Sequence, residues 1–276
     1  MTSQAPPSPA SQRWRPSPLV QASLGLHVGA LALVLARPSA WPWAVGGVIA
    51  DHALLTALGL TPRSALLGPN WTRLPAAAAA RRELAITIDD GPDPRITPRV
   101  LDLLDARGAR ATFFCIGERV QRYAELAREM VRRGHAVENH SQRHLHHFSL
   151  LGPRSLVAEI ERAQDTIGIT TGQQPLFFRA PAGFRSPFLD PVLSRLGLRL
   201  ASWTRRGFDT VRANAESVLG KLTHNLGTGD ILLLHDGHAA LTGNGVPVIL
   251  EVLPRLLDAL AAAELTPVTL REALTP

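Results

Sequence analysis

The chain has a single cysteine, Cys115, so an internal disulfide is excluded. Cys115 lies in the apolar run 111–116, and a catalytic thiol would need cationic, accessible surroundings, so we expect a buried structural residue. The composition also excludes collagen-like, coiled-coil and disulfide-scaffold proteins. The 276 residues have room for one large domain of α/β-barrel size and an appendage.

Runs of lysine and interleaved aromatic residues are absent, although the formal net charge is +6. Residues 1–83 hold seven arginines and two carboxylates, whereas residues 84–276 carry a net charge of only +1. The positive charges flank hydrophobic segments, which favours attraction to a membrane surface over a nucleic-acid groove. We therefore expect a membrane, and no nucleic acid, among the partners of this protein.

Two apolar segments near the N-terminus predict a membrane anchor. Residues 1–18 are rich in Pro, Ser and Gln and predict a disordered tail. Residues 19–60 contain the two apolar segments, separated by a short break, and each is just long enough to span a membrane as a helix of about 20 residues. Tryptophans at the segment ends, among them Trp41 and Trp71, predict an interfacial aromatic belt.

The number of membrane spans decides on which side the rest of the chain lies. An uncleaved anchor is favoured over a signal peptide because a second apolar segment follows the first directly. The second segment is the weaker span, since Asp51 and His52 lie midway along it and a central Asp costs roughly 2.5–3.5 kcal/mol. If both segments span a bacterial-type cytoplasmic membrane, the rest of the chain is cytoplasmic; if only the first spans, it lies outside.

Residues 61–83 predict a proline-containing linker, and residues 84–276 predict one α/β domain. Strands are expected at 84–89, 111–116, 135–139, 176–179, 198–203, 230–235 and 267–270. Helices are expected at 96–107, 118–133, 154–168, 187–196, 214–226 and 246–263. This alternation predicts parallel strands with crossover helices, in an open sheet or a barrel. Function in such folds gathers at the C-terminal ends of the strands.

Two adjacent carboxylates, Asp89 and Asp90, end the first of these strands, and Gly91 and Pro92 follow. Neighbouring carboxylates repel each other, so they usually persist where a cation or a proton separates their roles. We interpret one as a metal ligand and the other as a base. The alternative is that Asp89 caps the turn and Asp90 faces water.

Further titratable residues follow later strands. His140 and His144 are spaced i, i+4, and with Asp90 they would form a set of two His and one carboxylate that leaves metal positions open for water. The neighbouring His146 and His147 allow the alternative of a solvated loop that binds metal adventitiously, and we place both near the site or on the surface.

Arg179 follows an aromatic strand and can hold Asp89 ionised, unless it is a surface residue in a turn. His235 ends the apolar strand 230–235, where acid–base chemistry is favoured over a structural role because other predicted strands also end in such residues.

Four motifs in order resemble those of the polysaccharide deacetylases of carbohydrate esterase family 4, the NodB-like domain. They are Thr87-Ile88-Asp89-Asp90-Gly91-Pro92, His140-Ser-x-x-His144, Arg179-x-Pro-x-Gly183 and Leu233-Leu-His235-Asp236. The resemblance covers about residues 83–275 and implies a distorted (β/α) barrel of about seven strands.

The resemblance also implies a role for each matching residue. Asp89 would be the general base and His235 the general acid, with Arg179 tuning the base. A divalent metal, with zinc favoured, would be held by Asp90, His140 and His144. The substrate would contact Ala182, Gly183, Trp203 and Leu233, with a backbone N–H near Ala182 stabilising the oxyanion.

The chain departs from the family pattern at two places. Ala182 stands where many members have a tyrosine, so a wall facing the substrate is missing or supplied by another residue. Arg206 stands where we expect the carboxylate that orients the acid histidine. We assign that role to Asp209, with the alternative that Asp209 caps the following helix.

The predicted function is that of a membrane-anchored, metal-dependent hydrolase that removes N-acetyl groups from amino sugars of a polysaccharide or a lipid-linked glycan. One alternative is an amidase that acts on a non-sugar amide with the same site. Another is a catalytically silent glycan-binding domain. The sequence leaves the glycan, the metal, the membrane side and the oligomeric state open.

Overall fold

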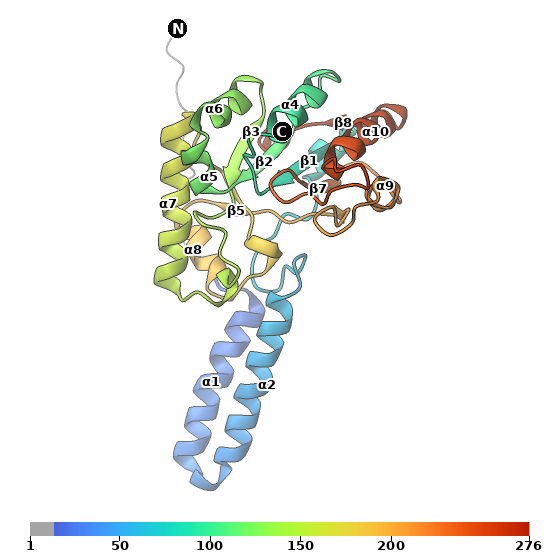
Figure 1. Cartoon of the computed structure of the whole chain (residues 1–276). Helices are drawn as coiled ribbons and strands as arrows, with labels where there is room; N and C mark the ends of the chain where they lie inside the picture. Colours follow the sequence, from blue (N-terminus) through green and yellow to red (C-terminus); the bar gives the residue numbers. More distant parts are fainter. Residues whose placement is uncertain (1–13, 276) are drawn as a thin grey trace.

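The structure is a computed structural model, and it describes residues 14–275. Most of the tail predicted for residues 1–18 lies outside the described residues. The described chain forms a two-helix hairpin and an α/β body, and the hairpin projects from one end of the body as a stalk (Figure 1).

The hairpin consists of α1 (Pro18–Ala36) and α2 (Trp41–Gly59), joined by a short 3₁₀ turn, η1 (Pro38–Ala40). Ser17 caps α1 because its side chain accepts a hydrogen bond from the amide of Val20. In the part of the chain that the structure describes, α1 is the one helix long and apolar enough to cross a membrane, with a mean hydropathy of 1.9. Many of its apolar side chains are exposed, so they lack a partner in this chain.

A polar cluster joins the two hairpin helices. Asp51 accepts a hydrogen bond from the Ser23 hydroxyl at 2.6 Å, and the Nε2 atoms of His27 and His52 lie 3.1 Å apart. Asp51 and His52 therefore contact α1, although they made the second segment the weaker span in sequence. Polar groups that pair between helices cost less in apolar surroundings than isolated ones.

The body contains a curled sheet of parallel strands, which confirms the predicted distorted (β/α) barrel. Its strand order is β5-β4-β3-β2-β1-β7-β6, and β8 pairs with the start of β1. The strands are β1 (Glu83–Asp89), β2 (Thr112–Cys115), β3 (Ala136–Asn139), β4 (Phe177–Phe178), β5 (Arg199–Leu200), β6 (Arg205–Arg206), β7 (Ile231–His235) and β8 (Thr266–Pro267). The longer strands β1 and β7 are apolar runs because both of their faces are covered.

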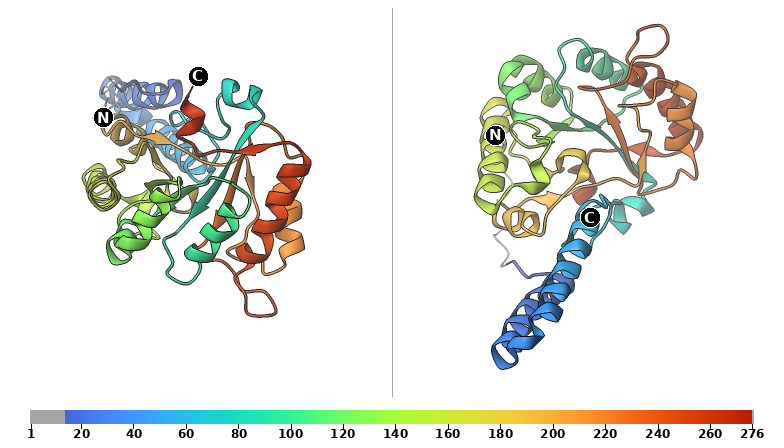
Figure 2. Two further views of the ribbon diagram at one scale, coloured as in Figure 1. Left: turned by 90° about the horizontal axis from the view of Figure 1, so that it is seen from above. Right: turned by 60° about the horizontal axis from the view of Figure 1, so that its bottom comes forward.

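Helices surround the outer face of this sheet (Figure 2). They are α4 (Thr97–Asp105), α5 (Gly117–Arg122), α6 (Ala124–Arg132), α7 (Pro153–Thr171), α8 (Leu189–Arg195), α9 (Ala215–Thr223) and α10 (Val248–Ala262). The short helix α3 (Ala76–Ala80) instead contributes Ala78 to the core on the inner face. Short 3₁₀ turns are η2 (Phe148–Leu150), η3 (Pro181–Gly183) and η4 (Glu272–Leu274). Their arrangement leaves the inner face of the sheet to a second core.

The two faces of β1 and β7 belong to different cores because side chains alternate along a strand. Ile86, Ile88 and Leu232 pack in the outer core against the helices. Ala85 and Leu233 pack in the inner core. Asp89 and His235 continue the inner set, so their side chains lie at the C-terminal end of the barrel interior. Cys115 is fully buried, and burial raises the pKa of its thiol, as expected of a structural residue.

Two predicted elements differ from the structure, and one strand was not predicted. The helix predicted at 118–133 is broken at Tyr123, whose backbone (φ −118°, ψ 50°) is not helical. The strand predicted at 267–270 is confined to β8, and the chain then leaves the sheet toward η4. The two residues of β6, both arginines, carried no apolar signal and were missed.

Residues 61–83 have the composition of a linker but are packed on the body. Leu67, Leu74 and Ala78 are buried. The Trp71 amide donates to the Leu200 carbonyl at 2.9 Å, and its ring meets the Phe177 ring edge-on at 5.2 Å between centroids. The prediction of Trp71 as part of an interfacial belt is therefore wrong, because this side chain packs against the inner core.

Candidate active site

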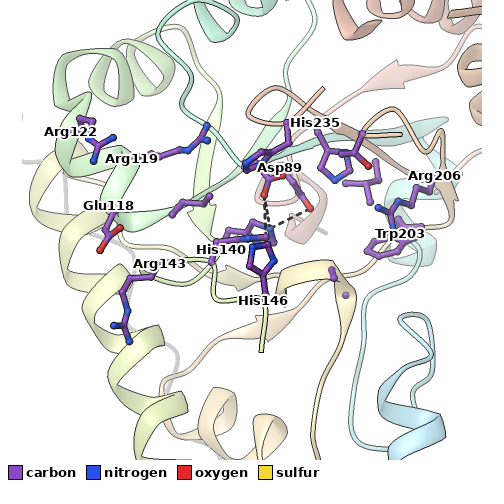
Figure 3. Close-up of a pocket in the computed structure, with 18 residues that line it drawn as sticks. Asp89, Glu118, Arg119, Arg122, His140, Arg143, His146, Trp203, Arg206 and His235 are labelled. Carbon is purple, nitrogen blue, oxygen red and sulfur yellow. Dashed lines mark hydrogen bonds and ion pairs between the residues drawn. The ribbon is translucent and has the colours of Figure 1, made fainter. Parts of the chain in front are cut away.

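The predicted site residues converge on one cleft of about 490 Å³ at the C-terminal ends of the strands (Figure 3). The register of the sheet places Asp89 directly beside His235. The residues proposed from sequence that line this cleft are Asp89, Asp90, His140, His144, Ala182, Gly183, Trp203, Leu233 and His235. Arg179 and Asp209 lie behind this lining, fully or almost fully buried.

Asp90, His140 and His144 form a group whose ligand atoms lie within 4.8 Å of one another. Asp90 Oδ1 is 3.4 Å from His140 Nε2 and 3.3 Å from His144 Nε2. This buried oxygen has no hydrogen-bond partner among the described residues. An unpaired buried carboxylate oxygen beside two imidazoles fits a divalent cation of the zinc type.

The surroundings of this group prepare it for a cation. The Nδ1–H of His140 donates to the Arg179 carbonyl at 2.8 Å, which leaves Nε2 as the ligand atom. Burial lowers the pKa of His144 to about 4, which favours the neutral, ligating imidazole. Burial alone would raise the pKa of Asp90, but His140 and His238 outweigh it and hold the pKa well below its usual value.

The backbone around the group is strained. Asp90 and His144 have φ values of 74° and 52°, in the left-handed region that non-glycine residues rarely adopt. Ser141, between the two histidines, has a φ of 64°. Such strain clusters where a site must be held in one geometry, because surrounding contacts have to compensate for it.

Arg179 is paired with Asp89. Its Nη1 donates to Asp89 Oδ1 at 2.7 Å and to the Thr87 hydroxyl at 2.8 Å, and its Nη2 donates to the Ser202 carbonyl at 2.7 Å. The guanidinium lies 4.1 Å from the centre of the Phe114 ring. Arg179 is therefore a buried cation with several hydrogen bonds and not a surface residue in a turn, so that alternative is wrong.

Only one Asp89 oxygen takes part in this pair. The other, Oδ2, lies 3.9 Å from His140 Nε2 and so faces the metal-type group. Asp89 thus has one oxygen held by a cation and one directed toward the centre of the cleft. This is the arrangement that a general base beside a metal needs.

Asp209 holds His235. Its Oδ1 accepts from the ring Nδ1 of His235 at 2.9 Å, and its Oδ2 accepts from the His235 amide at 2.6 Å. Burial alone would lower the pKa of His235, but the charge of Asp209 outweighs it and raises the pKa. The alternative that Asp209 caps α9 is wrong, because Asn214 caps this helix by accepting from the Ser217 amide at 2.8 Å.

The residues predicted to contact substrate form a wall of the cleft. Ala182 adopts a φ of 55° within η3. Gly183 has a φ of 77°, and a Cβ at this position would lie 2.6 Å from the Trp203 ring, so glycine is required here. Leu233 and Trp203 are buried, and they also belong to the inner core.

Several lining residues were not assigned from sequence. The ring Nδ1–H of His238 donates a hydrogen bond to Asp90 Oδ2 at 2.9 Å. Its spacing of three residues from His235 is the sequence signal that could have indicated a place in the same site. His146 lines the cleft, and His147 does not. The charged residues on the cleft walls are Glu118, Arg119, Arg122, Arg143 and Arg206.

Residues 76–201 match the polysaccharide deacetylase family. A peptidoglycan-N-acetylglucosamine deacetylase from Bacillus cereus is 36% identical over 179 residues, which cover 63% of this chain and 81% of that protein. A chitooligosaccharide deacetylase from Azorhizobium caulinodans is 35% identical over 153 residues, which cover 55% of this chain and 72% of that protein.

A solved structure supports the same assignment. The family 4 carbohydrate esterase from Streptomyces lividans, in complex with acetate, has a TM-score of 0.61 at 31% identity. The similarity covers 67% of this chain and 91% of that chain. The chain therefore belongs to the polysaccharide deacetylase family, carbohydrate esterase family 4. The protein is an enzyme of this family, an N-acetyl sugar deacetylase.

Proposed function

We propose that this protein is a membrane-anchored, divalent-metal-dependent deacetylase of an N-acetylated glycan. The observation that carries the proposal is the grouping of three potential ligands, Asp90, His140 and His144, beside the pair Asp89–Arg179. His235 lines the same cleft and is oriented by Asp209. Zinc is the favoured metal because the ligand set is nitrogen-rich and leaves positions open.

Two different residues of the cleft then carry out the two proton transfers of amide hydrolysis. A divalent cation, when bound, supplies a Lewis acid and a water whose pKa is lowered toward neutrality. Asp89, held by Arg179 at one oxygen, accepts a proton from the attacking water through its other oxygen. His235 donates a proton to the departing amine nitrogen, while Asp209 holds the opposite ring nitrogen. The amine stays on the sugar, and acetate leaves.

The hairpin supports the membrane part of this proposal. α1 and α2 are equal in length and packed side by side, so a bilayer that α1 crosses would enclose α2 as well. Trp41 and Trp43 are exposed, and they lie in the first turn of α2, directly after the η1 turn that joins the two helices. With both helices spanning, the body would lie on the cytoplasmic side, which favours a lipid-linked or small glycan precursor as substrate. A reporter fused to the C-terminus distinguishes the two sides.

The function is tested by acetate release from chitooligosaccharides, peptidoglycan fragments and lipid-linked N-acetyl sugars, with chelator or with added zinc. Asp89→Asn should keep the metal and lose turnover, whereas His140→Ala should lose both. Retained activity in Asp89→Asn would contradict the proposed base. Activity only on non-sugar amides would favour the amidase alternative, and wild-type protein without metal or activity would favour a silent glycan-binding domain.

A further inference from the structure

Arg206 stands where the family pattern places a carboxylate, but Asp209 already holds His235 with both of its carboxylate oxygens, at the backbone amide and the ring Nδ1. Arg206 is therefore not needed to orient His235. Exchanging a carboxylate for an arginine also changes the local charge by two units. We therefore relate the positive charge of Arg206 to the substrate that enters the cleft.

The side chain of Arg206 is held in place by aromatic rings. β6 pairs with β7 so that Arg206 lies beside Leu233, close to the strand end that carries His235. Its guanidinium carbon lies 5.4 Å from the centre of the Trp203 ring and 5.1 Å from that of Phe208. Such stacking fixes the plane of a guanidinium and leaves its N–H groups free to donate.

Arg206 has no acidic partner in the part of the chain that the structure describes, and its Nε is buried without a hydrogen-bond acceptor. Arg206 also lines the cleft. Arg143 in the same cleft differs, because its guanidinium pairs with Glu159 at 2.6 Å. Of these two arginines, Arg206 is therefore the one without an acidic partner of its own.

The opposite wall of the cleft is also cationic. Arg119 and Arg122 on α5 line it, and Figure 3 shows Arg119 and Arg206 on opposite sides of His140. No ion pair involves Arg119 or Arg122 within residues 14–275. Glu118 is the one acidic lining residue outside the central Asp pair, so positive charge exceeds negative charge on the walls.

We propose that Arg206 is an anion subsite that binds an oxyanion, a carboxylate or a phosphate, on the glycan beside the N-acetyl group that is removed. Arg119 lends positive potential from the facing wall. The planar guanidinium suits both anions because each presents two oxygens to its fork. This inference rests on the proposed function and specifies its substrate class. The carboxylate would come from an acidic sugar, and the phosphate from a carrier-linked sugar.

The test compares kcat/KM for three substrates: a neutral chitooligosaccharide, a peptidoglycan fragment with lactyl carboxylates, and a phosphate-linked N-acetylglucosamine. We expect wild type to favour one of the anionic substrates by about tenfold at low salt, the effect of one charge-assisted hydrogen bond. Arg206→Gln should bring this ratio close to one, mainly through KM. Arg162→Gln, an exposed change on α7 that does not line the cleft, should leave the ratio as in wild type.

Two further measurements keep the test independent of folding. The wild-type preference should fall as ionic strength rises, because added salt screens a solvent-accessible charge. Arg206→Lys should retain part of it, since lysine keeps the charge but not the fork. Equal use of neutral and anionic substrates by active wild type, or a ratio that Arg206→Gln leaves unchanged, would overturn the anion subsite alone. No acetate from any substrate would overturn the proposed function and this inference together.

Discussion

Asp209 binds His235 at two points, accepting from the ring Nδ1 at 2.9 Å and from the backbone amide at 2.6 Å. The carboxylate therefore sets both the position and the ring orientation of this histidine. It also leaves Nε2 as the ring nitrogen that Asp209 does not occupy, in a side chain that lines the cleft. Asp209 lies 26 residues before His235 in the chain, so this relationship depends on the packing of two strand ends.

Asp209→Asn should lower kcat by about 10²–10⁴-fold, the range typical of general acid–base catalysis. Loss of the carboxylate charge lowers the pKa of His235, which Asp209 raises in the wild type. A general acid must be protonated, so the high-pH limb of the kcat profile should move to lower pH. The profile of Asp165→Asn, an exposed change on α7, should match wild type. An unmoved limb in Asp209→Asn would exclude this pairing.

Arg179→Ala should destabilise the folded protein by about 3–5 kcal/mol, because it leaves the buried Asp89 carboxylate without its cation. Arg179→Lys should lose less, since it keeps the charge but not the several hydrogen bonds. Urea unfolding measures both, with the exposed Arg162→Ala as the matched control. A loss below about 1 kcal/mol in Arg179→Ala would show that Asp89 does not depend on this pair.

Removal of metal by a chelator should abolish acetate release and lower Tm together, and zinc should restore both. A ligand bound only by the folded protein stabilises it by about 4 kcal/mol at a thousandfold excess over Kd. Tm with and without chelator checks this, because it needs no substrate. His144→Ala should show little response of Tm to chelator. If wild-type Tm and activity were both indifferent to chelator, Asp90, His140 and His144 would not be a metal site.

The buried His135 should make stability depend on pH. Its Nδ1 accepts from the Ala111 amide, its ring packs against Phe113, and burial lowers its pKa from 6.5 to about 4. Between these values the unfolded chain binds a proton that the folded protein does not. The free energy of unfolding is therefore highest, as far as His135 is concerned, above pH 6.5. It falls by about 2–3 kcal/mol as the pH drops toward 4.

His135→Gln should flatten this part of the stability profile relative to wild type. Urea unfolding at several pH values between 4 and 7 measures the difference. His224→Gln, a change at an exposed histidine, serves as the control and should keep the wild-type slope. Parallel profiles for wild type and His135→Gln would rule out His135 as the source.

Local signals were sufficient for much of the fold. The apolar runs that became β1 and β7 were recognised because strands buried on both faces have no polar alternation. The Gly-Pro turn after Asp90 marked where β1 stops. Composition misled at residues 61–83, because proline content says nothing about whether Leu67 and Leu74 find a core to pack in.

The sequence by itself determined which residues end the strands and in what order, and hence that Asp89, Asp90, His140, Arg179 and His235 would meet at one edge. These are short-range properties of the chain. Only the tertiary structure decided that Asp209 holds His235 and does not cap α9, and that His238 reaches Asp90. Such contacts depend on the register between strands and on how loops cross the barrel mouth, and no local pattern encodes either.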